Sequence, residues 1–594
     1  MRKFILAGIL ILFGLLLFTY PTAKEIAAGV AILLFGMIML EEGFNSLVSG
    51  PLQNVLKRST DKLYKSLGIG FLSTAILQSS SLITVIVISF VSAGLVELRA
   101  GIGIIFGSNL GTTATAWLVS TIGLKLDIAG LAMPMLAFGI ILVLQKSTKL
   151  KGLGKVLAGL GFFFMGIYFM KNGFDTYQES INLADYSMEG IKGLLIFTCI
   201  GVLLTLILQS SSATMALILT ALAVGQITYT NSLSLAIGAN IGTTITAIIG
   251  SLGSNISGKR LAGAHSIFNI VTGVVALVLI GYLEDLVDLI CEWIGISSSN
   301  YTFKLSLFHT IFNILGILIM LPLINPLIKV LHRLFRAKAK EDLIEQPRFL
   351  DETSKAYPQT AMLALRNESK RLFENAAFKI IANGINIHSK DLFGEEKIKA
   401  IVKRSRQEIK VNIEELYLQK VKTIYSKIIE YATIAQSQFQ MTTELNDRFA
   451  QIKLANRNIV ESIKALDSVR KNMTRYLNAE NNIIQKEYDR LRVKIADIIR
   501  ELYVLTKDEN PENHLERLEK LKAKAEKSDI LFDGTLDKLI KEGSITSPMA
   551  SSLANDSQNI ALISKKLIEA GELIYIKQDT LHAEDELEPN SELS

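Results

Sequence analysis

The apolar positions of the chain gather in long runs up to about residue 331, and beyond that point they alternate with charged positions. A helix needs about 20 apolar residues to cross a bilayer. The apolar runs are 4–20, 26–48, 67–95, 101–122, 128–145, 156–170, 192–225, 232–250, 261–282 and 304–331. This division predicts an all-α chain with a polytopic membrane domain over 1–331, followed by a soluble domain.

Two of the apolar runs, 67–95 and 192–225, are too long for one untilted helix and too short for two spanning helices joined by a turn. Each carries a polar Gln-Ser-Ser-Ser motif near its middle, where an unsatisfied polar group costs several kcal/mol. The motifs are Gln78, Ser79, Ser80 and Ser81, and Gln209, Ser210, Ser211 and Ser212. We predict two re-entrant helical hairpins with the motifs at their tips. The alternative, serines that only permit close helix packing, accounts poorly for two copies.

Lysine and arginine in short loops predict which loops lie in the cytoplasm. The basic loops 2–3, 57–65, 146–155, 259–260 and 332–340 are assigned inside, and the acidic loops 175–189 and 284–292 outside. This assignment gives about eight spanning helices and two hairpins, with both termini cytoplasmic. The first hairpin then enters from the cytoplasmic side and the second from the outer side. The run 4–20 resembles a signal peptide but is long for one, so we interpret it as a span.

A second pair of motifs, Gly-x-Asn-x-Gly-Thr-Thr, occurs at 107–113 and 238–244. Gln78 and Gln209 are 131 positions apart, and so are Asn109 and Asn240. The shared spacing predicts two repeats, at about 26–122 and 156–250, and the loop charges give them opposite orientations. Inverted repeats with a site at the membrane midplane are the architecture of many secondary transporters. The glycines permit unwinding or, alternatively, a tight helix contact.

The side chains of these motifs are neutral hydrogen-bonding groups. Their oxygens suit a hard cation such as Na⁺, and their hydroxyl and amide donors, together with free backbone N–H groups, suit an oxyanion. The motifs contain no Lys, Arg or His. A bound dianion would therefore need co-bound cations and helix ends to offset its charge. Cation coupling is a physical expectation, although these residues alone identify neither the cation nor the anion.

Several other polar residues in the apolar region are weaker candidates. Histidine and asparagine four positions apart share a helix face, and such pairs could line the permeation path or form a structural clamp between the last two helices. These pairs are His265 with Asn269 and His309 with Asn313. Glu41 and Glu42 lie near the cytoplasmic end of their helix and are expected at the interface, with one able to reach the vestibule. Nothing predicts a catalytic site, a cofactor, or a metal at the two cysteines.

The paired Gln-Ser-Ser-Ser motifs, each followed by Gly-x-Asn-x-Gly-Thr-Thr, resemble the type II sodium-phosphate cotransporters and their bacterial relatives over about 26–331, as do the His-x-x-Phe-Asn elements. The resemblance implies Na⁺-coupled phosphate movement across the plasma membrane. It implies that both Gln-Ser-Ser-Ser motifs, with Thr214, form the phosphate and sodium sites. It further implies sodium coordination by Asn109, Thr112, Thr113, Asn240, Thr243 and Thr244. The stoichiometry stays open.

The region after 331 divides into a linker at 332–357, a helical bundle at 358–581 and an acidic tail at 582–594, which we expect to be disordered. The bundle resembles the PhoU-like domains fused to bacterial transporters, which implies a regulatory role and a regulatory partner. The alternative is a bundle that forms a homodimer or only stabilises the chain. The net charge of +6 does not indicate a nucleic-acid partner.

These observations predict a sodium-coupled secondary transporter of inorganic phosphate, not an enzyme, that works by alternating access in the lipid bilayer. Two alternatives stay open. One is a membrane-anchored phosphate sensor or signalling protein, whose pocket binds phosphate without moving it. The other is an exporter or exchanger of another small anion.

Overall fold

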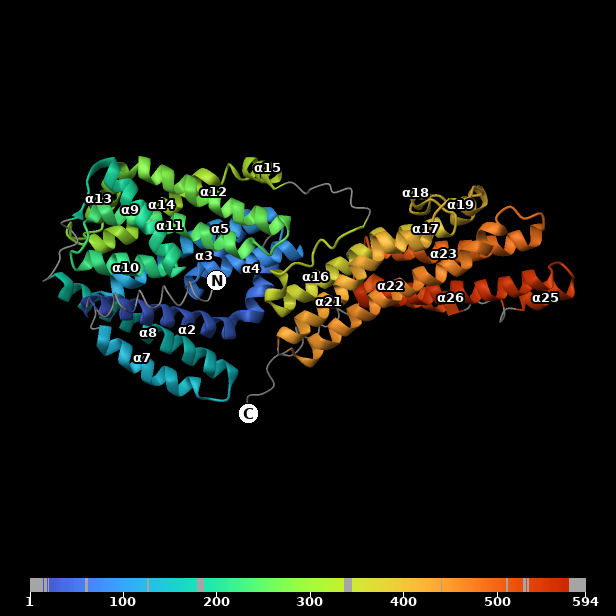
Figure 1. Ribbon diagram of the computed structural model, residues 1–594, viewed down its shortest axis with the longest axis horizontal. Helices are drawn as coiled ribbons and strands as arrows, with labels where there is room; N and C mark the ends of the chain where they lie inside the picture. The colour runs from blue at the N-terminus through green and yellow to red at the C-terminus, as the bar shows by residue number, and fades with distance from the viewer. Residues whose placement is uncertain are drawn as a thin grey trace. The chain divides into compact units, whose positions relative to one another are not determined.

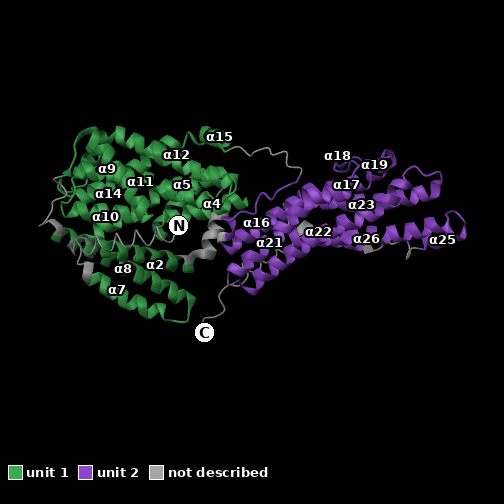
Figure 2. Ribbon diagram, viewed as in Figure 1, with its two compact units in different colours: residues 1–337 green, residues 338–594 purple. Residues whose placement is uncertain are grey.

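The computed structural model describes most of the chain, and within its described residues every regular element is helical (Figure 1). The described residues are 21–58, 62–124, 128–178, 186–335, 344–439, 441–508, 511–526 and 534–575, with the single positions 14, 19 and 530. The chain forms two compact units, Met1–Ala337 and Lys338–Ser594 (Figure 2). Their boundary falls within the predicted linker. Apart from positions 14 and 19, the predicted span 4–20 lies outside the described residues, and so does the predicted tail 582–594.

The first unit is built from apolar helices. They are α2 (Pro21–Arg58), α3 (Leu63–Leu77), α4 (Ser80–Ala93), α5 (Leu98–Gly111), α6 (Thr113–Leu118), the π-helix η1 (Val119–Gly123), α7 (Ile128–Val143), α8 (Thr148–Gln178), α9 (Gly190–Leu208), α10 (Ser211–Ala223), α11 (Tyr229–Ser251), α12 (Ile256–Val278), α13 (Ile280–Trp293), α14 (Tyr301–Met320) and α15 (Ile324–Leu334). Seven helical segments among the described residues are long and apolar enough to cross a membrane, which indicates a multi-pass membrane protein.

The seven segments differ from the predicted eight spans in three ways besides the run 4–20. The helix in the predicted span 128–145 is shorter than a full crossing, whereas α9, predicted as one arm of a hairpin, is itself long enough to cross. The predicted span 304–331 is divided into α14 and α15. Pro322 follows α14 and Pro326 lies in the first turn of α15, and proline cannot donate the backbone hydrogen bond that would continue α14.

Helices α2 and α8 pack along their lengths through glycines, with residue numbers that rise along one helix as they fall along the other, so the two are antiparallel. A β-carbon at Gly36 would overlap the backbone of Phe163, and one at Gly166 would overlap the backbone of Leu33. The same contact is therefore made twice with the partners exchanged, at an offset of 130 positions. In Figure 1, α7 lies along the other side of α8, against which it also packs.

Two further helix pairs repeat one contact at an offset of 131 positions. A β-carbon at Gly107 of α5 would overlap the carbonyl oxygen of Leu67 on α3. A β-carbon at Gly238 of α11 would overlap the carbonyl oxygen of Thr198 on α9. The glycines of the Gly-x-Asn-x-Gly-Thr-Thr motifs thus permit close backbone approach. The helix carrying the second motif is continuous, while the first is interrupted only at Thr112.

The second unit is a helical bundle. Its elements are the 3₁₀ turn η3 (Ser354–Ala356), α16 (Pro358–Arg371), the π-helix η4 (Leu372–Ala377), α17 (Phe378–Gly384), α18 (Ser389–Leu392), α19 (Ile398–Arg404), α20 (Ile413–Tyr417), the π-helix η5 (Leu418–Lys422), α21 (Thr423–Gln438), α22 (Thr443–Arg475), α23 (Asn482–Leu505), α24 (Pro511–Glu526), α25 (Thr535–Lys541) and α26 (Ser547–Tyr575). Helix α26 packs against α22, α23 and α24.

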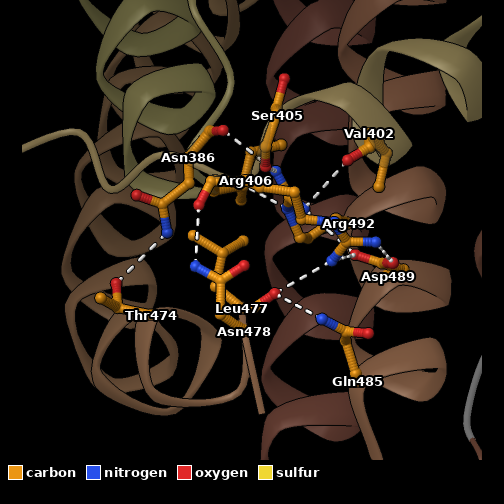
Figure 3. Close-up of polar contacts among 11 residues, drawn as sticks. Asn386, Val402, Ser405, Arg406, Thr474, Leu477, Asn478, Gln485, Asp489 and Arg492 are labelled. Atoms are coloured by element: carbon orange, nitrogen blue, oxygen red, sulfur yellow. Dashed lines mark hydrogen bonds and ion pairs between the residues drawn. The ribbon is translucent and has the colours of Figure 1, made fainter. Parts of the chain in front are cut away.

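One arginine joins three helices of this bundle (Figure 3). Arg492 of α23 is fully buried and donates to the carbonyl oxygens of Ile385, Asn386 and Ser405 at 2.9, 3.0 and 2.9 Å. These carbonyls follow the last residues of α17 and α19, where helical carbonyl groups lack an intrahelical partner. Asp489 completes the arrangement with an ion pair to Arg492 at 3.1 Å. A buried charge is thus satisfied on every side.

Candidate functional site

Each Gln-Ser-Ser-Ser motif interrupts the helical backbone at its glutamine. Gln78 ends α3 with φ 55° and ψ 21°, and Gln209 ends α9 with φ 53° and ψ 20°. The left-handed conformation costs a non-glycine residue about 1 kcal/mol or more, so the surrounding structure must impose it. The two breaks have the same backbone geometry, although they lie in different parts of the sequence. That each break is the tip of a re-entrant hairpin stays a prediction.

The first serine of each motif caps the helix that follows. The Ser79 hydroxyl accepts from the Leu82 amide of α4 at 3.3 Å, and the Ser210 hydroxyl accepts from the Ala213 amide of α10 at 3.1 Å. Ser80 is buried and Ser81 half-buried at the start of α4, while Ser211 and Ser212 are both buried at the start of α10. Hydroxyl groups and a helix N-terminus therefore lie together at each break, a combination suited to an anion.

The two glutamines differ in their surroundings. The Gln78 amide donates to the Ala75 carbonyl at 2.5 Å and accepts from the Thr115 hydroxyl of α6 at 2.7 Å. Gln209 is exposed, and Thr246, which corresponds to Thr115, donates instead to the Thr243 carbonyl at 2.7 Å. Thr115 was not among the predicted site residues. The signal for it was its match with Thr246 at the shared offset of 131 positions.

Thr214 lies at the second break, as the resemblance implied. Its hydroxyl donates to the Ser210 carbonyl at 2.9 Å and accepts from Thr205 of α9 at 3.1 Å. Thr214 is fully buried, so it ties the first turn of α10 to the preceding arm. Its hydroxyl proton is directed at the backbone, which leaves an oxygen lone pair for any further interaction.

The Gly-x-Asn-x-Gly-Thr-Thr motifs use opposite faces for different purposes. Their glycines pack on α3 and α9, whereas Asn109 and Asn240 are buried against other helices. In both copies the first threonine donates to the asparagine carbonyl at 2.6 Å, from Thr112 in one and Thr243 in the other. The second threonines, Thr113 and Thr244, are also buried. Each motif therefore has a glycine face in close contact with a neighbouring helix and a polar face that lies against other helices.

The polar faces meet in a buried cluster of amides and histidine. Asn240 of α11 donates to the side-chain oxygens of Asn269 on α12 and Asn313 on α14, each at 3.2 Å. Asn269 donates in turn to Thr243 at 3.2 Å. Asn109 of α5 is paired with His265 of α12 at 3.2 Å. Four helices, α5, α11, α12 and α14, thus contribute to this amide cluster.

Two side-chain nitrogens of the amide cluster have no hydrogen-bond partner within the described residues. They are Asn109 Nδ2 and His265 Nδ1. Buried polar atoms are normally satisfied by protein or by water, because leaving one unpaired costs about 1–3 kcal/mol. The cluster therefore has free polar atoms with which to bind water or an ion. In the described part of the chain, no three His, Cys, Asp or Glu side chains converge on a metal position.

The second arm of each break packs against the Gly-x-Asn-x-Gly-Thr-Thr helix of the other half. Helix α4 packs against α11, and α10 packs against α6, which continues from α5. Within the described residues, no hydrogen bond joins the two breaks directly. The predicted site residues therefore fall into three groups, the two breaks and the amide cluster, which these helix contacts link.

Comparison with known proteins points to one family. The sequence profile of the Na⁺/Pi-cotransporter family matches residues 32–172 and 190–321. YqeW, an uncharacterized protein of Bacillus subtilis, is 33% identical over 327 residues, which cover 52% of this chain and 97% of that protein. Escherichia coli YjbB, provisionally named as an inorganic phosphate export protein, is 25% identical over 464 residues, 75% of this chain and 82% of YjbB.

A mammalian protein matches over a short segment. Sodium-dependent phosphate transport protein 2A of Ovis aries is 50% identical over 52 residues, which are 9% of this chain and 8% of that protein. No solved structure matches the chain.

Proposed function

The chain belongs to the Na⁺/Pi-cotransporter family, and on that basis we propose that it is a sodium-coupled secondary transporter of inorganic phosphate. One observation carries the proposal. Two helix breaks of the same geometry, at Gln78 and Gln209, each lead into an arm packed against a helix of the other half. A composite site of this kind has one half from each repeat, and relative movement of the halves gives access from alternate sides.

The exchanged contacts of α2 and α8 support an inverted repeat. Gly36 meets Phe163 as Gly166 meets Leu33, and the two helices are antiparallel. Corresponding helices that run in opposite directions are what inverted-topology repeats require. The two breaks would then enter the membrane from opposite sides, as the loop charges predict.

The chemistry of the site suits phosphate together with a cation. Hydroxyl and N–H donors at the starts of α4 and α10 would hold the phosphate oxygens. The amide and hydroxyl oxygens of Asn240, Thr243 and their counterparts would hold sodium. The predicted Gln-Ser-Ser-Ser and Gly-x-Asn-x-Gly-Thr-Thr residues bring no positive charge, so bound sodium would offset the charge of the dianion, and this couples the two movements.

We assign the second unit a regulatory role on the cytoplasmic side of the plasma membrane, where both termini would lie. The basic run after residue 331 supports that side. A role in forming a homodimer is the alternative for this bundle.

A second candidate is phosphate export. YjbB, whose provisional name refers to export, aligns with 75% of this chain. The same site would serve both directions, because a coupled carrier runs down the sum of its gradients.

The test is the flux of labelled phosphate in proteoliposomes under inward, outward and absent Na⁺ gradients. An inward gradient should drive phosphate accumulation, and Gln209→Ala should abolish it. Gln145→Ala is the matched control, since Gln145 is exposed at the end of α7. Efflux of phosphate from phosphate-loaded vesicles in the absence of Na⁺ would favour export. The absence of Na⁺-dependent flux in both directions would overturn the proposal.

A further inference from the structure

The last helix of the first unit, α15, has two separate apolar faces. Ile324, Leu327 and Leu331 are buried, and the helix packs against α12 and α5. Val330 and Leu334, which are four positions apart and so share another face, are 44% and 66% exposed. The described part of the chain therefore covers one apolar face of α15 and leaves the other uncovered.

The remaining face of α15 is basic. Lys329 and Arg333, again four positions apart, are exposed on the side opposite the buried face. Within the described residues, no carboxylate forms an ion pair with either of them. An exposed apolar stripe beside lysine and arginine is suited to a membrane interface, because the apolar side chains enter the acyl region while the cations meet the headgroups.

The position of α15 in the fold agrees with such a location. It follows α14, which is long and apolar enough to cross a membrane. At its other end, the Arg260 guanidinium group donates to the Phe335 carbonyl at 2.9 Å. A β-carbon at Gly263 would be 3.0 Å from the Leu331 side chain. The end of α15 therefore lies beside the first turns of α12, next to the loop 259–260 that is predicted to be cytoplasmic.

Helix α13, which precedes α14, has the same division of faces with the opposite charge. Its exposed apolar residues recur at intervals of four, three and four positions, and they are Tyr282, Leu286, Leu289 and Trp293. All of its charged residues are acidic, namely Glu284, Asp285, Asp288 and Glu292. This helix contains the loop predicted to be outside. An anionic lipid would therefore distinguish α15 from α13 although both expose an apolar stripe.

We infer that α15 is a docking surface for anionic phospholipids of the cytoplasmic leaflet. Lys329 and Arg333 bind the headgroups, and Val330 and Leu334 enter the acyl region. A negatively charged leaflet attracts each lysine or arginine near its surface. A second copy of the chain fits this surface less well, because a symmetric contact brings the same basic residues of both copies together.

The experiment measures hydrogen exchange of the full-length protein in nanodiscs of phosphatidylcholine, with and without about one third phosphatidylglycerol. The anionic lipid should slow exchange in a peptide covering 324–335 at least threefold. High salt should remove most of this difference, since it screens the attraction between exposed charges. The double variant Lys329→Gln/Arg333→Gln should exchange equally in both lipids. Exchange in 280–293, which covers α13, should not depend on the anionic lipid.

The matched control is Lys149→Gln/Lys151→Gln. Both lysines are exposed in the basic loop 146–155, so this variant removes the same charge from the same predicted side of the membrane. It should keep the wild-type response to phosphatidylglycerol.

Equal exchange of 324–335 in both lipids for the wild type would overturn the inference and leave the exposed face to a second copy of the chain. A full response in the α15 double variant, or its loss in the control variant, would overturn it too. If the α15 variant does not fold, salt decides, because a wild-type response that is unchanged at high salt contradicts binding through Lys329 and Arg333. None of these measurements uses transport, so their outcome is independent of the proposed function.

Discussion

Asn240 is the residue on which the amide cluster depends, because its side-chain nitrogen donates hydrogen bonds to the side-chain oxygens of two other asparagines. Asn240→Ala leaves the buried oxygens of Asn269 and Asn313 without this donor, at a cost of about 1–3 kcal/mol for each unsatisfied group. We expect a lower melting temperature in detergent and loss of phosphate uptake. Asn240→Asp should be at least as damaging, because it directs a carboxylate at two amide oxygens.

The control for this change is Asn325→Ala, since Asn325 is exposed on α15. It should leave both the melting temperature and uptake at wild-type values. A fully active Asn240→Ala protein would show that the cluster is neither structural nor part of the site.

Arg492 has a comparable role in the second unit, where its guanidinium group donates hydrogen bonds to carbonyl oxygens at the ends of two helices. Arg492→Lys keeps the charge but replaces a planar fork of donors with a single ammonium group. We expect a loss of stability of about 3 kcal/mol, in the range found when a buried charge loses its partners. Hydrogen exchange of the full-length protein should accelerate in peptides covering 384–388 and 402–406.

Arg457→Lys is the corresponding surface change, because Arg457 is exposed and forms an ion pair with Glu461 within one helix. Such exposed pairs contribute at most about 1 kcal/mol. Exchange in the two peptides should therefore be unaffected by this variant. Equal exchange in both variants would contradict the role given to Arg492.

At the scale of elements, glycines set the distance between helices. Gly107→Ala places a methyl group on the carbonyl oxygen of Leu67, and backbone cannot move aside without separating α5 from α3. Gly68 lies on α3 with no atom within 4 Å of its would-be β-carbon. We expect Gly107→Ala to reduce both the yield of folded protein and uptake. Gly68→Ala should be neutral or stabilising by up to about 1 kcal/mol, because alanine favours the helix.

Both variants exchange glycine for alanine in neighbouring helices. A difference in their stability therefore reports the effect of the added methyl group on helix packing and not the effect of the residue type. Thermal melting in detergent, with uptake measured alongside, provides the readout. Equal melting temperatures would mean that α3 and α5 can separate without cost, contrary to the contact described.

An ion pair joins α13 and α14, and we expect the loss of its acidic member to destabilise the protein more than the loss of its basic member. Lys304 is buried, lies near the rings of Tyr229 and Tyr301, and pairs with Asp288 at 2.7 Å, whereas Asp288 is about half exposed. Asp288→Asn leaves a buried ammonium group without its partner, while Lys304→Met leaves a carboxylate that water can solvate. We expect a lower melting temperature for Asp288→Asn than for Lys304→Met, and the reverse order would contradict the buried charge.

The sequence predicted elements well where the signal is local. The helix breaks at Gln78 and Gln209 coincide with the polar motifs that the apolar runs carry near their middles. The split of the span 304–331 was missed although Pro322 and Pro326 were visible. The two prolines lie within an otherwise continuous apolar run, so apolar character alone predicts a single span. The length of α9, which alone could cross the membrane, was equally hidden within the longer apolar run.

The site could be predicted only in its separate parts, because its assembly depends on long-range contacts. His265 and Asn109 are separated by 156 positions and Asn240 and Asn313 by 73, and no periodicity joins them. From the sequence, the histidine-asparagine pairs fit a structural clamp as well as a lining of the permeation path, so they are weaker candidates. The asymmetry of the two glutamines, in which Thr115 donates to Gln78 while Thr246 donates to the Thr243 carbonyl, has no signal in the motif itself.

At the scale of the whole molecule, all of the candidate site residues belong to the first unit, Met1–Ala337. The hydrophobic core of that unit is formed by its own helices, with α2, α8, α10, α11 and α14 among its contributors. Each unit has a core of its own, as independently folding domains do. The second unit therefore need not supply binding energy for phosphate or sodium.

Truncation after Ala337 tests this division. We expect the shortened protein to keep Na⁺-driven phosphate uptake in proteoliposomes, with half-saturating phosphate and Na⁺ concentrations within about threefold of wild type, a factor equal to less than 1 kcal/mol. Its maximal rate should change in whichever direction the second unit regulates, because a regulatory domain shifts the population of active states rather than the intrinsic affinity. The full-length Arg492→Lys protein provides the companion measurement, since it perturbs the second unit without removing it. A truncated protein that folds, as judged by its melting curve, but does not transport would make the second unit part of the transport machinery. The same maximal rate in all three proteins would instead exclude regulation under the conditions of the assay and favour the stabilising or dimer-forming role.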